Sequence, residues 1–125
     1  MTDLSDYPLI YLEHFQNPHN VGVCNAHTHR AVGAVEPGFG CFDQLEITLR
    51  ICNDTIEEAR FRGRLCSGSL ASASLLTTLI EGKTVAEALA IEPDTLSEVW
   101  GFIPTGKEHS LHFAIATLRD ALSSR

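Results

Sequence analysis

Cysteine, aspartate and histidine residues stand beside the starts of predicted strands and helices in this sequence. Cys41 and Asp43 precede a strand, and Cys66 precedes a long helix. His109 and Ser110 lie in the first turn of the last predicted helix. Thiolate, carboxylate and imidazole groups bind borderline-soft metals such as zinc and iron. If the fold brings these segments together, Cys41, Asp43, Cys66 and His109 form a site with four metal ligands.

The local structure expected at each position suits metal binding. The unsatisfied N–H groups and the positive dipole end of the helix after Cys66 favour a thiolate there. The same field disfavours a charged imidazolium at His109, which leaves the ring able to bind a metal. Cys41 and Asp43 are two residues apart, so both side chains can point to one face of a strand. Each residue alone is also explained by packing or solvation, and the sequence has no Cys-x-x-Cys pair.

Two other groups of side chains could form a site, one for a metal and one for hydrolysis. Cys24, His27 and His29 form a Cys-x-x-His-x-His pattern that could bind a metal. Three such residues in a polar stretch more often bind nothing, so we leave them out of the principal site. Ser110 and His109 with Asp43 could in principle form a hydrolase triad. Adjacent serine and histidine rarely reach the geometry that base activation needs, and no nucleophile elbow surrounds them.

Length and composition bound the kind of protein. The 125 residues are enough for a single domain over 1–125, and 44% of them are hydrophobic. The net charge of −7, without a run of Lys or Arg, argues against nucleic-acid binding. No apolar stretch approaches membrane-spanning length, and residues 1–6 lack the form of a signal peptide. We therefore expect a cytoplasmic protein whose four cysteines are reduced, with Cys52 packed as a small buried hydrophobe.

The hydrophobic patterns predict an α+β fold, a small antiparallel three-stranded sheet with helices packed on one face. Residues 44–52 are expected to form a strand with one wet face, because apolar and polar residues alternate from Gln44 to Ile51. The other strands are expected within 28–35 and at 55–62, and a tight turn is expected at Asn53-Asp54. Helices are expected at 6–15, 67–81, 84–90, 93–99 and 107–122, with Leu9, Leu12 and Phe15 sharing a face of the first. Residues 123–125 are expected to fray.

Three ordered segments carry a resemblance to a known family. Residues 14–22, HFQNPHNVG, look like the opening signature of iron–sulfur cluster assembly scaffolds of the NifU amino-terminal and IscU type. Residues 56–62, IEEARFR, followed by Cys66 and a Ser/Ala-rich helix to 81–83, are similar to the family's central block. Glu87-Ala88-Leu89 continues the likeness, which covers nearly the whole chain.

The resemblance implies an α+β fold whose three cysteines and one aspartate hold a labile [2Fe–2S] cluster, or zinc when no cluster is present. Cys41 and Cys66 match the first two cysteines of the family, and Asp43 matches the aspartate. Lys107 and His109 match the lysine and histidine ahead of the third cysteine. The resemblance also implies partners, namely a cysteine desulfurase that supplies sulfur and proteins that accept the finished cluster.

The sequence departs from the family pattern at the third cysteine, where Ser110 stands. A hydroxyl stays protonated near neutral pH, binds soft metals poorly and cannot form a persulfide. Phe42 replaces the usual glycine beside Cys41, and Pro104-Thr105-Gly106 replaces a chaperone-binding motif of some members. Lys107 and Ser110 are expected beside the ligands instead of among them.

Two functions remain open at this point. The first is a scaffold that binds iron or a [2Fe–2S] cluster through Cys41, Asp43, Cys66 and His109 and passes it on. The second is a zinc-binding protein of the same fold that has lost cluster building and modulates a desulfurase or a sibling scaffold. Neither makes a covalent change to a small substrate, so we expect a protein that is not an enzyme. A hydrolase around Ser110 is the distant alternative.

Overall fold

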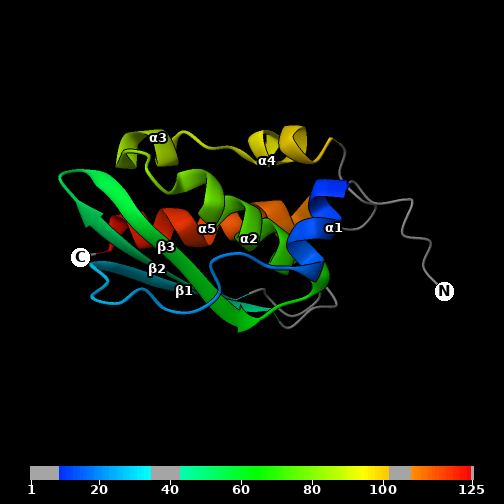
Figure 1. Ribbon diagram of the computed structural model, residues 1–125, viewed down its shortest axis with the longest axis horizontal. Coiled ribbons are helices and arrows are strands. Elements are labelled where there is room, and N and C mark those ends of the chain that lie inside the picture. The colour runs from blue at the N-terminus through cyan, green and yellow to red at the C-terminus, as the bar shows by residue number, and fades with distance from the viewer. Residues whose placement is uncertain (1–8, 35–42, 102–107, 125) are drawn as a thin grey trace.

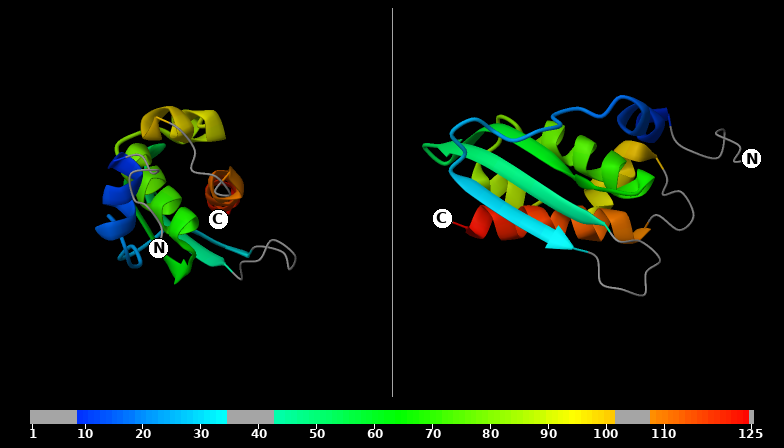
Figure 2. Two further views of the ribbon diagram at one scale, coloured as in Figure 1. Left: turned by 90° about the vertical axis from the view of Figure 1, so that its right-hand side faces the viewer. Right: turned by 90° about the horizontal axis from the view of Figure 1, so that it is seen from below.

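The computed structural model describes residues 9–34, 43–101 and 108–124. Its three strands form one antiparallel sheet in the order β1-β2-β3 (Figure 1). Two helices, α2 and α5, pack on one face of this sheet, and α4 packs on them from the other side (Figure 2). The elements in chain order are α1 (Leu9–Gln16), β1 (His29–Ala34), β2 (Gln44–Cys52), β3 (Thr55–Arg64), α2 (Ser67–Ile80), α3 (Val85–Leu89), α4 (Pro93–Trp100) and α5 (Glu108–Ser123). The expected α+β architecture is confirmed.

The central strand β2 separates the core from the opposite face of the sheet. Leu45, Ile47 and Leu49 are fully buried on the side that meets the helices. The intervening Glu46 and Thr48 belong to the other face, because successive strand residues point in opposite directions. The helices contribute Leu76 and Ile80 of α2 and Leu111, Ala114, Ile115 and Leu118 of α5, all of them buried. The predicted helical spacing of α5 is thus confirmed as a core-facing stripe.

Local signals placed several element ends correctly. Asn53 and Asp54 both have positive φ, the conformation of the tight turn that joins two antiparallel strands. Thr84 and Glu87 form the capping box expected at the start of α3, with both reciprocal hydrogen bonds present. Strand β3 extends two residues beyond the expected range, to Arg64.

Helix α1 differs from the expected pattern. Leu9 is 84% exposed and Phe15 is 39% exposed, whereas Tyr11 and His14 are buried. The helix packs against α2 and α4 through these two buried side chains. His14 Nδ1 lies 2.6 Å from Ser74 Oγ of α2. Tyr11 packs edge-on against Trp100, with ring centroids 4.9 Å apart.

Two further expectations were wrong. Cys52 is exposed, and among the described cysteines Cys24 is the buried one: its amide donates to Thr48 Oγ1, and its Sγ donates to the Thr48 carbonyl. Cys24 lies where the chain crosses the sheet, a long-range packing that its polar neighbours did not indicate. Fraying was also expected at residues 123–125, but Ser123 belongs to α5 and the Ser124 hydroxyl accepts a hydrogen bond from the Arg30 amide; Arg125 lies outside the described residues.

None of the described helices is long and apolar enough to cross a membrane.

Burial makes His14 a pH-sensitive link between α1 and α2. Burial, and after it the charge of His19, lowers the pKa of His14 below its ordinary value of 6.5, although Glu13 opposes the shift. The unfolded chain therefore binds more protons than the folded one as pH falls below about 6.5, so the free energy of unfolding decreases there. In urea unfolding at pH 7.5 and 5.5 we expect His14→Asn to reduce this loss of stability. His112→Asn, at an exposed position of α5, is the control and should keep it. If His14→Asn loses as much stability between pH 7.5 and 5.5 as the wild type does, protonation of His14 is not the cause of the loss.

Gly63 is required where β3 passes the start of β2. Its φ is +152°, and an added Cβ would lie 1.9 Å from the carbonyl oxygen of Gln44. Gly82 also has a positive φ, of +85°, but an added Cβ there would meet nothing within 4 Å. We expect Gly82→Ala to cost about 1 kcal/mol of backbone strain. Gly63→Ala should cost at least about 3 kcal/mol, because the clash adds to the strain. Chemical denaturation measures both, and equal losses would show that the close approach is unimportant.

Candidate metal centre

The starts of β2, α2 and α5 lie at the same end of the molecule (Figures 1 and 2). Asp43, Cys66 and His109 stand at these three starts, as the sequence predicted. The fold therefore brings the three segments to one end. Cys41 and Lys107 lie outside the described residues.

The carboxylate of Asp43 is bonded to the start of α2. Only 4% of this residue is exposed. Its Oδ1 accepts a hydrogen bond from the Cys66 amide at 2.9 Å, and its Oδ2 accepts one from the Ser69 hydroxyl at 2.5 Å. The first N–H groups of a helix have no partner within the helix, and an anion there is favoured by the dipole. Asp43, directly before β2, thus supplies the side-chain cap that Cys66 does not give to α2.

Cys66 occupies the N-cap position of α2 and makes no side-chain cap hydrogen bond. Its thiol is half-buried and lies 3.6 Å from the Ser69 hydroxyl. Ser69 therefore touches both the Asp43 carboxylate and the Cys66 sulfur. Sequence reasoning missed Ser69, although a serine three residues after an N-cap cysteine is a position from which a hydroxyl can turn back to the helix start.

His109 and Ser110 occupy the first turn of α5. His109 is half-buried, and Ser110 is fully buried. Within the described part of the chain the Ser110 hydroxyl has no hydrogen-bond partner. A serine nucleophile needs a base in hydrogen-bond contact, so this arrangement does not support the hydrolase alternative.

No three His, Cys, Asp or Glu side chains in residues 9–34, 43–101 and 108–124 lie close enough to hold a metal ion. The structure joins Asp43 to Cys66 through an amide and Ser69, but it does not gather Asp43, Cys66 and His109 around one point. Cys24, His27 and His29 do not form a metal site either, since Cys24 is buried against Thr48 while His27 is exposed. The ligand set that includes Cys41 stays a prediction.

Comparisons with known proteins agree on one family. The sequence matches the family described as NifU-like N terminal domain over residues 7–124. It is 34% identical over 110 residues to the iron-sulfur cluster assembly scaffold protein IscU 1 of Archaeoglobus fulgidus, a match covering 88% of this chain and 70% of that protein. It is also 34% identical over 103 residues to the zinc-dependent sulfurtransferase SufU of Bacillus subtilis, covering 82% of this chain and 64% of that protein.

Solved structures show the same fold at lower sequence identity. FiSufU of Fervidobacterium islandicum has a TM-score of 0.78 at 19% identity, covering 98% of this chain and 100% of that one. A NifU-like protein from Brucella abortus, amino-terminal part, has a TM-score of 0.73 at 16% identity, covering 95% and 94%.

The contacts of Asp43 give a stability prediction. Asp43→Ala leaves the Cys66 amide and the Ser69 hydroxyl without their acceptor, and we expect it to lower the free energy of unfolding by about 2–3 kcal/mol. Asp43→Asn keeps one carbonyl oxygen for the Cys66 amide, so it should cost about half as much. Urea denaturation without added metal measures both. If Asp43→Ala unfolds at the same urea concentration as the wild type, the carboxylate does not stabilise α2.

Proposed function

Since this chain belongs to the NifU-like N-terminal domain family, we propose that it is an iron–sulfur cluster assembly scaffold. In this proposal it binds iron or a labile [2Fe–2S] cluster as cargo and passes that cargo to acceptor proteins. The ligands are Cys41, Asp43, Cys66 and His109. In this proposal Lys107 and Ser110 are not ligands but adjust the charge and polarity of the site.

The observation that carries the proposal is the contact between Asp43 and the start of α2. This contact holds the Asp43 carboxylate beside the half-buried thiol of Cys66, at the N-terminal end of a helix, where negative groups are favoured. The Ser69 hydroxyl can rotate away from Oδ2, while Oδ1 keeps its bond to the Cys66 amide. Asp43 can therefore offer one oxygen to a cation without giving up the cap of α2.

The donor set fits an iron or zinc cargo. The Ser110 hydroxyl is fully buried and has no partner among the described residues, and such a group costs free energy. A cargo bound beside His109 would supply a polar neighbour for it. Two thiolates, one imidazole and one carboxylate are a donor set that zinc and iron both accept.

Zinc binding without cluster building is the second candidate. It is favoured by the resemblance to the Bacillus subtilis protein, whose name states zinc dependence, and by Ser110 in place of a thiol. In this case the protein keeps the fold and modulates a desulfurase or a sibling scaffold.

We further propose that the protein is not an enzyme, since binding and transfer of a cargo need no chemistry on a small substrate. Its partners are a cysteine desulfurase and cluster-accepting proteins. We propose the cytoplasm as its location, where thiols stay reduced; Cys24, Cys52 and Cys66 are free cysteines.

Anaerobic reconstitution with iron and sulfide tests the proposal. We expect a brown protein that contains sulfide, measured by absorbance and by metal and sulfide analysis. Cys66→Ala should lose this cargo, and Cys52→Ala, which changes an exposed thiol, is the matched control that should keep it. Ser110→Cys should raise the cluster yield by adding a third thiolate, whereas Ser110→Ala should not.

Three outcomes would contradict parts of this account. A colourless product that retains one zinc favours the second candidate. Loss of cargo from Cys52→Ala but not from Cys66→Ala means that other thiols are the ligands. An unchanged yield in Ser110→Cys means that Ser110 is not the position of a missing ligand.

A further inference from the structure

The sheet face opposite the helices concentrates positive charge in an acidic protein. The chain has nine Lys and Arg residues and a net charge of −7. Strand alternation and register assign five of the arginines to this face. They are Arg30 of β1, Arg50 of β2, and Arg60, Arg62 and Arg64 of β3.

Two glutamates, Glu46 and Glu58, divide four of these arginines into two groups, and Arg50 also donates to Glu57 at 3.3 Å. Glu46 accepts hydrogen bonds from the Nε atoms of Arg30 and Arg62, one on each neighbouring strand. We call these three residues the open triad. Glu58 accepts hydrogen bonds from Arg50 at 3.1 Å and from Arg60 at 3.0 Å. We call these three the covered triad.

The two triads differ in access. The segment that leads into β1 crosses the sheet beside the covered triad: the Gly22 amide donates to the Phe61 carbonyl, and the Cys24 amide donates to Thr48 Oγ1. The side chains of Arg50 and Arg60 are 38% and 39% exposed. Those of Arg30 and Arg62 are 52% and 61% exposed, although the Glu46 side chain between them is only 10% exposed.

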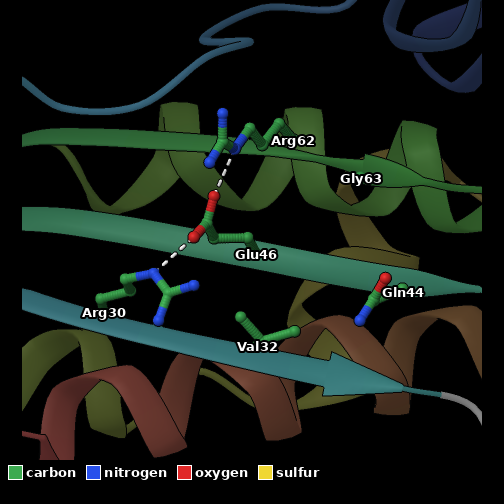
Figure 3. A pocket seen from close by; sticks show the side chains of 6 residues that line it. All are labelled: Arg30, Val32, Gln44, Glu46, Arg62 and Gly63. Atoms are coloured by element: carbon green, nitrogen blue, oxygen red, sulfur yellow. Dashed lines mark hydrogen bonds and ion pairs between the residues drawn. The ribbon is translucent and has the colours of Figure 1, made fainter.

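The open triad borders a hollow of about 270 Å³ on the sheet (Figure 3). Val32, Gln44 and Gly63 complete its lining. Each arginine uses Nε for Glu46, and its terminal Nη atoms make no hydrogen bond to the described residues. Glu46 therefore fixes the orientation of two guanidinium groups while leaving their outer donors available.

The charge state of the open triad favours an incoming anion. Burial opposes the ionisation of Glu46, but hydrogen bonds from Arg62 and Arg30 outweigh it and hold the pKa of this carboxyl below its ordinary value. Near neutral pH the triad therefore carries two positive charges and one negative charge. Arg64 pairs with Gln44 at the same end of the sheet and adds a further positive charge.

We propose that the open triad binds an acidic segment of a partner protein, with a carboxylate seated at the outer Nη donors of Arg30 and Arg62. Guanidinium groups bind carboxylates through paired charge-assisted hydrogen bonds. Val32, which is 43% exposed, gives the same segment an apolar contact. A nucleic acid is a poorer occupant, because its extended phosphate backbone would meet a net charge of −7. Gln44, which lines the hollow, directly follows Asp43, but Asp43, Cys66 and His109 are not among the residues that line it.

A fluorescent oligoglutamate peptide at low ionic strength tests the proposal, with binding measured by anisotropy. We expect Arg30→Gln/Glu46→Gln/Arg62→Gln to weaken binding about tenfold. Arg50→Gln/Glu58→Gln/Arg60→Gln makes the same net charge change in the covered triad, although it also removes the Arg50 partner of Glu57; it is the control and should bind nearly as the wild type does. Arg30→Lys/Arg62→Lys keeps the charge but removes the planar donors, and it should weaken binding by an intermediate factor.

A second measurement covers the case in which a triple variant does not fold. Amide NMR shifts of the wild-type protein, followed as the peptide is added, should concentrate at residues 30–34, 44–46 and 62–64. Four outcomes overturn the proposal. They are no binding by the wild type, equal losses in the two triple variants, equally tight binding of inorganic phosphate at the same positions, and salt-sensitive self-association that occupies this face.

Discussion

The hydrogen bonds of the Asp43 carboxylate to the start of α2 are the interaction on which the rest of the site depends. They join the beginning of the central strand to a helix that is buried along most of its length. Without an acceptor, backbone amides at the start of a helix remain unpaired. The Asp43 carboxylate therefore stabilises the fold, and it lies beside Cys66 as well. In the function proposed above, a structural role and a cargo-binding role fall on this one side chain, and Ser69 contacts both Asp43 and Cys66.

The same central strand serves two surfaces of different chemistry. On one side Leu45, Ile47 and Leu49 form the floor of the core under α2 and α5. On the other side Glu46 organises two arginines of the neighbouring strands. Alternation along β2 keeps the two functions apart, because a one-residue shift of register would bury the charges and expose the apolar side chains. Alternation therefore keeps the apolar core and the arginine face on opposite sides of the sheet.

Patterns that repeat along the chain allowed much of the fold to be predicted. Alternation placed β2, the capping box placed α3, and the apolar spacing of α5 identified its buried face. Predictions failed where burial depends on one distant contact. Tyr11 and His14 of α1 are buried against Trp100 and Ser74, and Cys52, expected to be buried, is exposed. No local pattern encodes such contacts, since the partners are separated by many residues.

The sequence by itself determined the family, the order of the elements, and the positions of Asp43, Cys66 and His109 at element starts. These follow from residue types and periodicity, which are local properties. Only the tertiary structure decided that both oxygens of Asp43 bond to α2, that the Ser110 hydroxyl is buried without a described partner, and that one arginine triad is open. Each of these depends on which strands and helices become neighbours, and the distances between neighbours arise only when the whole core packs together.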